Sequence, residues 1–270
     1  MAIINMLQFP FVQLAFVVGT LIALCCAGLG YFLVLERYAL IGDGLAHVSF
    51  AAIALSLVLG ATPLWIMIPI VMMASLVIRK ITQSAKLHGD AAIGLVSSVS
   101  AAIAIALASM GHGFNVDIMS YLFGSILAIT TTDVWVSLAL CSLILVALAI
   151  LHPYLFAAAY DREFARANGI MVDRVTTVLI LLTSLTVALG CRIVGTLLIS
   201  SLIVFPTITA LQWVNSFRRS LVMALGISVV GVLTGIILSL SVNIPTGAAI
   251  VLVNAAMFCV AFIGRKIASR

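Results

Sequence analysis

Runs of about 20 apolar residues follow one another along almost the whole chain, separated by short polar segments. An α-helix of that length spans roughly 30 Å, the thickness of the hydrocarbon core of a lipid bilayer. Charged residues make up 8% of the 270 residues and hydrophobic residues 64%, whereas a soluble domain has about 25% charged residues with which to cover its surface. The sequence therefore predicts an all-α, polytopic helical membrane protein embedded in the lipid bilayer.

The apolar runs define nine candidate spans, and no charged linker separates them. Residues 1–270 are therefore expected to form a single transmembrane domain. Two candidates are weaker, because the run at 175–190 is short and the next one opens with Arg192 and contains Pro206. These two could form one broken or re-entrant element, which leaves eight spans as the alternative. The nine candidates lie near 11–34, 41–60, 63–79, 91–110, 132–151, 175–190, 193–211, 220–241 and 246–264.

Basic residues mark the predicted cytoplasmic side. If the N-terminus is outside, all the Lys and Arg residues except Arg192 fall on the inner side, which agrees with the positive-inside rule and places the C-terminus in the cytoplasm. The net charge of +5 then reflects topology and contact with anionic headgroups, and no nucleic-acid partner is expected. The inner residues are Arg37, Arg79, Lys80, Lys86, Arg162, Arg166, Arg174, Arg218, Arg219, Arg265, Lys266 and Arg270.

An acid and an imidazole, Asp43 and His47, stand four residues apart near the start of the second span. Four residues are about one helical turn, so both side chains project from one face. An ionisable residue within a span costs about 2.5–3.5 kcal/mol and is tolerated where it pairs, faces a cavity or carries substrate. A metal or proton path is one interpretation. The other is that Asp43 caps the helix at the interface and His47 hydrogen-bonds a neighbour.

The length of the second span favours a position within the membrane. Counted back from the turn at 60–63, a helix of about 20 residues must begin near Ile41, since a start at Val48 would leave about 13 residues and roughly 20 Å. Glu36, just before this span, is expected to form an interfacial ion pair with Arg37. The small residues around Asp43 and His47 allow close helix approach or a narrow conduit; they are Gly42, Gly44, Ala46, Ser49, Ala51, Ala52 and Ala54.

A charged segment, residues 160–169, lies in a predicted cytoplasmic loop at about 153–174. Helix-forming Ala residues and a terminal Gly predict a short amphipathic helix ended by a glycine cap. The residues alone leave two interpretations open, a solvated linker and a docking helix for a soluble partner. Three further stretches combine Gly, Ser, Thr or Pro with apolar residues; they are 120–129, 192–210 and 243–252.

In this order and spacing, the five stretches resemble the permease subunit of the ABC-3 family of metal-ion importers, which carry zinc, manganese or iron. The resemblance covers essentially the whole chain. One departure is residues 206–210, Pro-Thr-Ile-Thr-Ala, where the family often has Pro-Ala-Ala-x-Ala; it bears on the pore lining. The matches are Gly42, Asp43, Leu45 and His47 to Gly-Asp-x-Leu-x-His, residues 160–169 to Phe-Asp-x-Glu-x-Ala-x-x-x-Gly with Tyr160 in place of Phe, and Leu122–Ser125, Val194–Pro206 and Pro245–Leu252.

The resemblance implies a transmembrane domain of the metal or vitamin B12 permease type in a bacterial cytoplasmic (inner) membrane. It implies an importer with two permease chains (a homodimer or a pair of different chains), cytoplasmic ATPase subunits and an extracytoplasmic metal-binding protein. Asp43 and His47 would form a transient metal site, and Asp161, Glu163 and Gly169 would lie at the ATPase contact. The sequence has no Walker A pattern, so we expect no enzyme, no permanently bound cofactor, and ATP bound by the partner subunit.

The donor pair bears on the transported ion and on other classes of protein. Imidazole with carboxylate suits Zn²⁺, and carboxylate with water suits Mn²⁺; the histidine favours zinc, with manganese or iron as alternatives. Two protein ligands bind weakly enough to release an ion. A proton-coupled secondary metal transporter usually shows an internal repeat, which is not evident here. An intramembrane metalloprotease needs a pattern such as His-Glu-x-x-His, which is absent from the sequence, and a vitamin B12 or siderophore permease needs a wide path without an Asp/His pair.

Overall fold

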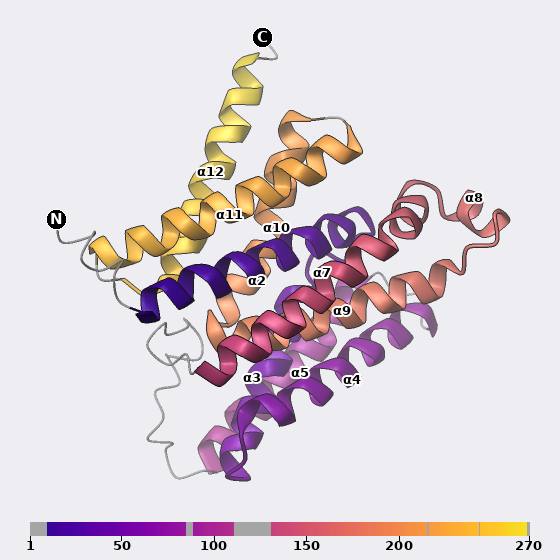
Figure 1. The fold of residues 1–270 in the computed structure, drawn as a ribbon. Coiled ribbons are helices and arrows are strands. Elements are labelled where there is room, and N and C mark those ends of the chain that lie inside the picture. The colour runs from indigo at the N-terminus through magenta and orange to yellow at the C-terminus, as the bar shows by residue number, and fades with distance from the viewer. Residues whose placement is uncertain (1–9, 85–88, 111–130, 215, 243, 269–270) are drawn as a thin grey trace.

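The computed structural model describes residues 10–84, 89–110, 131–214, 216–242 and 244–268. Within these ranges all regular secondary structure is α-helical, and eight helices are long and apolar enough to cross a membrane (Figure 1). The prediction of an all-α polytopic protein is confirmed. The eight are α2 (Pro10–Leu35), α3 (Ile41–Val58), α4 (Pro63–Ser84), α5 (Gly89–Met110), α7 (Thr131–Tyr160), α9 (Val172–Ile193), α11 (Phe217–Val242) and α12 (Thr246–Ala268), and between them lie α8 (Arg162–Ala167) and α10 (Thr196–Trp213).

The two runs that decide between eight and nine spans form α9 and α10. The expected short run at 175–190 is wrong in its length, since α9 has 22 residues. The hydroxyls of Thr176, Thr183 and Thr186 each donate to the carbonyl four residues earlier, so these polar side chains are accommodated within the helix. Gly195, with φ of 97°, separates α9 from α10. The apolar part of α10 is shorter than the eight spans and covers Leu198–Trp213.

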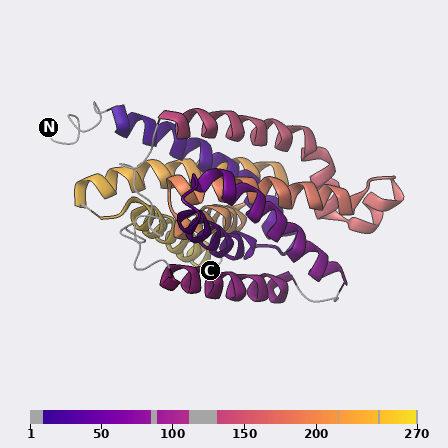
Figure 2. The ribbon, with the colours of Figure 1, turned by 90° about the horizontal axis from the view of Figure 1, so that it is seen from below.

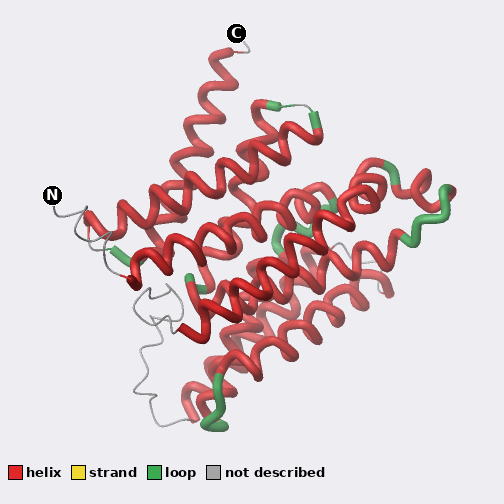
Figure 3. The backbone as a smooth tube through the Cα atoms, viewed as in Figure 1, coloured by secondary structure: helices red, strands yellow, loops and turns green. Residues whose placement is uncertain are grey.

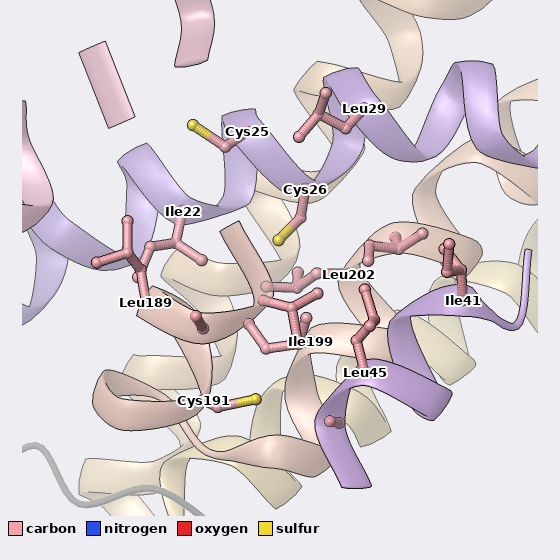
Figure 4. Packing of buried hydrophobic residues seen from close by; sticks show 14 of the residues in the cluster. Ile22, Cys25, Cys26, Leu29, Ile41, Leu45, Leu189, Cys191, Ile199 and Leu202 are labelled. Carbon is pink, nitrogen blue, oxygen red and sulfur yellow. The ribbon is translucent and has the colours of Figure 1, made fainter. Parts of the chain in front are cut away.

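The short helix α10 packs among α2, α3, α11 and α12. Figure 4 shows Cys26 of α2, Ile199 and Leu202 of α10 and Leu45 of α3 directed toward one another in this core. α2 and α10 approach closely at Gly30, where an added Cβ would lie 2.3 Å from the carbonyl oxygen of Ile203. A glycine is required there because any side chain would force the two backbones apart. Figure 2 shows α7 and α5 on opposite sides of this core.

One end of the bundle, which we call the α8 end, gathers the ends of α2 and α4, the start of α9, and α8 with its flanking loops (Figure 3). Arg79 of α4 lies 3.4 Å from the carboxylate of Asp173 of α9, and Arg162 of α8 lies 2.9 Å from the carboxylate of Glu36. Three arginines predicted to be cytoplasmic, Arg79, Arg162 and Arg166, therefore lie together. Because α3 begins shortly after α2 ends, its first turn also lies near the α8 end.

Candidate metal site and docking helix

Asp43 lies inside the first turn of α3. The helix begins at Ile41, and the backbone N–H groups of Asp43 and Gly44 both donate to the carbonyl of Leu40 at 3.1 Å. Leu40 occupies the N-cap position, and no side chain caps the helix there. The interpretation of Asp43 as a helix cap is therefore wrong. Within the described chain, neither Asp43 nor His47 has a side-chain hydrogen bond, so both remain available as ligands.

The glycines on either side of Asp43 are packed against neighbouring helices. A Cβ at Gly42 would lie 2.7 Å from Cδ1 of Ile203 in α10, and one at Gly44 would lie 2.6 Å from Cγ2 of Ile93 in α5. The other small residues predicted around the pair are likewise buried. Of the two roles proposed for them, close helix approach is therefore the one that the structure shows. Packing of both glycines holds the first turn of α3 in place while Asp43 stays exposed.

The carboxylate and the imidazole share one face of α3, as their spacing predicts. Oδ2 of Asp43 lies 3.9 Å from Nε2 of His47, and the side chains are 54% and 45% exposed. Two ligands about 2.1 Å from one ion at a tetrahedral angle lie roughly 3.4 Å apart, so a side-chain movement of about half an ångström would let both reach it. The geometry fits a divalent ion held from one side.

Few further ligands lie near the pair in the part of the chain that the structure describes. Among the described residues, no group of three or more His, Cys, Asp or Glu side chains could hold a metal ion. A site limited to Asp43 and His47 leaves most coordination positions to water or to another molecule, because structural metal sites use four protein ligands. Such a site suits an ion in transit better than a resident metal.

The predicted amphipathic segment forms α8, and local hydrogen bonds define both of its ends. Oδ1 of Asp161 accepts from the backbone N–H groups of Glu163 and Phe164 at 2.9 and 3.0 Å, which is an N-cap. Gly169 adopts φ of 79°. The N–H groups of Gly169 and Ile170 donate back into α8 at 3.0 Å each, which is a Schellman C-cap. The predicted glycine cap is confirmed.

These contacts distinguish the roles of the three residues that the family resemblance placed at the ATPase contact. Asp161 and Gly169 shape α8 itself, whereas the Glu163 side chain is exposed and free to meet another molecule. Tyr160 and Phe164 are 84% and 66% exposed at the same end. Exposed aromatic side chains beside a charged helix are typical of protein–protein contact sites. Sequence reasoning passed over Phe164, although an aromatic residue in a charged segment is a usable signal.

Glu36 does not form the predicted ion pair with Arg37. Arg37 adopts a left-handed conformation with φ of 63°, and the carboxylate of Glu36 instead accepts from Nη2 of Arg162 at 2.9 Å and from the hydroxyl of Thr176 at 3.1 Å. The earlier expectation was wrong because the better cation comes from a segment 126 residues away. No local sequence pattern signals such a contact.

Of the three remaining motifs, two lie within the residues that the structure describes. Leu122–Ser125 lies outside the described residues. Val194–Pro206 contains the break between α9 and α10 and continues into α10, where Pro206 is internal. Pro245–Leu252 leads into α12, which begins at Thr246. In the described chain these two stretches lie in α10 and α12, which pack against each other.

Comparisons with known proteins agree with the resemblance seen in the motifs. A family model described as the ABC 3 transport family matches residues 8–265. A Treponema pallidum protein named "Probable metal transport system membrane protein" is 38% identical over 249 residues, covering 92% of this chain and 93% of that protein. The "Manganese import system permease protein ScaB" of Streptococcus gordonii is 29% identical over 255 residues, covering 94% of this chain and 91% of that protein.

A solved structure shares the fold. The structure described as PsaBC from Streptococcus pneumoniae in complex with Fab matches with a TM-score of 0.85 and 27% sequence identity, over 97% of this chain and 94% of that chain. The arrangement of helices in that solved structure therefore extends over nearly all of the present chain.

Proposed function

The chain belongs to the ABC 3 transport family, and we propose that it is the permease through which a divalent transition-metal ion enters a bacterium across the cytoplasmic membrane. The observation that carries this proposal is the pair Asp43 and His47, which lies 3.9 Å apart and about half exposed on a helix that spans the membrane. An acid and an imidazole on such a surface are costly against lipid and useful along an ion path.

We propose manganese as the transported ion, with zinc as the alternative. Relatives named as manganese import permeases support manganese, and the single imidazole supports zinc, because zinc readily accepts nitrogen ligands. A carboxylate with several waters also satisfies Mn²⁺. The ion is cargo, so weak binding by two side chains is an advantage: a closed cage of four ligands would hold the ion too tightly to release it.

A second permease chain completes the path in this proposal. Asp43 and His47 lie on the surface of the single chain, while most of α3 is buried against α4, α5, α9 and α10. Exposed ionisable residues within a span avoid lipid when another protein surface faces them. A paired chain, identical or homologous, would provide that surface and further ligands for the ion.

The energy source in this proposal is a separate ATPase that binds α8. The helix stands at the α8 end with Glu163, Tyr160 and Phe164 exposed, and the chain carries no Walker A pattern of its own. The chain is then a transport subunit and no enzyme. An extracytoplasmic metal-binding protein would deliver the ion to the opposite end of the bundle.

Uptake of radioactive ⁵⁴Mn²⁺ by proteoliposomes containing the permease and its ATPase tests this function, with Zn²⁺ and Fe²⁺ as competitors. We expect Asp43→Asn and His47→Gln to abolish uptake while the ATPase still copurifies. Asp90→Asn is the matched control, because Asp90 is also an exposed acid in the first turn of a span, and it should retain uptake. Full uptake by both site variants would refute the metal-path role, and stronger competition by Zn²⁺ than by unlabelled Mn²⁺ would identify zinc as the cargo.

A further inference from the structure

Glu36 is a buried carboxylate at the α8 end. It belongs neither to the pair Asp43 and His47 nor to the exposed side chains of α8. Its side chain is 1% exposed, whereas the side chain of Arg162, its partner, is 49% exposed. The carboxylate accepts from Arg162 and from Thr176 of α9. An ionised carboxylate in so buried a position is stable only with a cation and hydrogen-bond donors. Arg162 therefore ties α8 to the end of α2.

A hydrogen-bonded turn joins Glu36 to α3, the helix that carries Asp43 and His47. The N–H groups of Glu36 and Tyr38 donate back into the last turn of α2 at 2.9 and 2.8 Å, and the N–H of Ile41 donates to the carbonyl of Tyr38 at 3.1 Å. Tyr38 itself is buried. Because these bonds hold both ends of the turn, a displacement of Glu36 shifts the first turn of α3, which carries Asp43.

The surroundings of the ion pair give Arg162 room to move. A hollow of about 340 Å³ adjoins the pair and is lined in part by Leu35, Ala158 and Tyr160. The buried carboxylate is confined by α2 and α9, but the half-exposed guanidinium sits on a six-residue helix at the surface. Movement of α8 therefore either carries Glu36 along or breaks the pair, and breaking it would leave a buried charge unpaired.

Resting on the proposed function, we propose that Glu36 is a positioning residue that transmits the movement of α8 to Asp43 and His47 through its ion pair with Arg162. When the ATPase shifts α8, Arg162 pulls on Glu36, and the turn after α2 moves the start of α3. Hydrolysis of ATP by the partner then changes the geometry of the metal pair at the α8 end. Without the ion pair, fewer metal ions would be transported for each ATP that the partner hydrolyses.

A second arginine on α8 provides the matched control. Arg166 has the same charge as Arg162 and a similar exposure, 55% against 49%. It lies 3.4 Å from the carboxylate of Asp173, only seven residues further along the chain. Neutralising Arg166 removes a charge from the same docking helix but leaves the contact with Glu36 in place.

The experiment measures Mn²⁺ uptake and ATP hydrolysis together in proteoliposomes that contain the permease with its ATPase. For Arg162→Gln we expect uptake per ATP to fall at least about fivefold, with copurification of the ATPase and the KM for Mn²⁺ within about twofold of wild type. Arg162→Lys should restore most of the ratio because it restores the charge, and Arg166→Gln should leave it unchanged. Glu36→Gln should reproduce Arg162→Gln.

Each outcome is decisive. Wild-type uptake per ATP in Arg162→Gln, or an equal loss in Arg166→Gln, overturns the role of Glu36, and so does a failure of Arg162→Lys to recover the ratio. A loss of ATPase copurification in Arg162→Gln would show that the arginine serves docking and would also overturn the proposal. If the wild-type complex itself moves no Mn²⁺, Zn²⁺ or Fe²⁺, the proposed function fails. This result is distinguishable from the outcomes above, because they compare variants with a wild-type complex that transports metal.

Discussion

Replacement of Gly30 by alanine is expected to destabilise the contact between α2 and α10. The new Cβ would lie 2.3 Å from the carbonyl oxygen of Ile203 and 2.9 Å from its Cα. Ordinary contacts begin at 3.4 Å, so the two helices must separate locally by roughly 1 Å in an interior packed as densely as an organic crystal. Because the obstructing atoms belong to a backbone, rotation of a side chain cannot relieve the clash.

The expected cost follows from these distances. Overpacking of this kind costs about 1–3 kcal/mol, and the better helix propensity of alanine returns about 0.5–1 kcal/mol, which leaves a net loss of roughly 1 kcal/mol and at most about 2.5 kcal/mol. Thermal unfolding of the purified protein in detergent, followed by circular dichroism, should show a midpoint several degrees lower. The loss should also reduce transport, since Glu36 directly follows the last residue of α2.

Gly226→Ala is the control for this prediction. Gly226 lies within α11, and an added Cβ there would meet no atom within 4 Å, so alanine should leave the midpoint unchanged or raise it. Equal midpoints for Gly30→Ala and Gly226→Ala would refute the reasoning, because the two substitutions differ only in what the new methyl group meets.

Three further predictions concern the proposed docking helix and metal site. Glu163→Arg should reduce copurification of the ATPase without loss of folding, because Glu163 is exposed and has no side-chain partner within the described chain; unchanged copurification would make α8 an ordinary linker. Gly169→Ala should destabilise the end of α8 by about 1–2 kcal/mol, because a side chain is strained at φ of 79°, and proteolysis near 169 should become faster; Gly94→Ala, on an open helical surface, should not change it. Mn²⁺ affinity should fall as pH is lowered, because imidazole and carboxylate bind metal only when deprotonated, and titrations of the His47→Gln variant should show a weaker pH dependence.

The sequence predicts the helices well because each one must satisfy its own backbone within lipid. The starts of α3 and α4 follow directly from the run lengths, and the C-cap at Gly169 follows from helix-ending chemistry. Two boundaries are wrong where residues that are not apolar lie within a helix. α7 continues through Pro153 to Tyr160, past the predicted end at 151 and into the predicted loop at 153–174. α9 begins already at Val172 because its threonines bond to their own turns. Hydropathy counts those residues as breaks, although the helix itself satisfies their hydroxyls.

The candidate metal pair is predictable for a related reason. Asp43 and His47 are four residues apart, and local helix geometry alone places them on one face. Their exposure is not predictable from spacing, because it depends on which neighbours α3 meets. Packing of Gly42 on α10 and of Gly44 on α5 leaves Asp43 on the surface, and these contacts join segments far apart in the chain.

What the sequence determines by itself is therefore the membrane-spanning helical class, the basic side of the bundle, the local shape of α8 and the shared face of Asp43 and His47. Each of these depends on interactions within about one helical turn or on the partition of a segment between water and lipid. Only the tertiary structure decides that Glu36 pairs with Arg162 and that Arg79 is buried against Asp173. A charged side chain finds its partner through the packing of whole helices, and that packing depends on the combined shape of all of them.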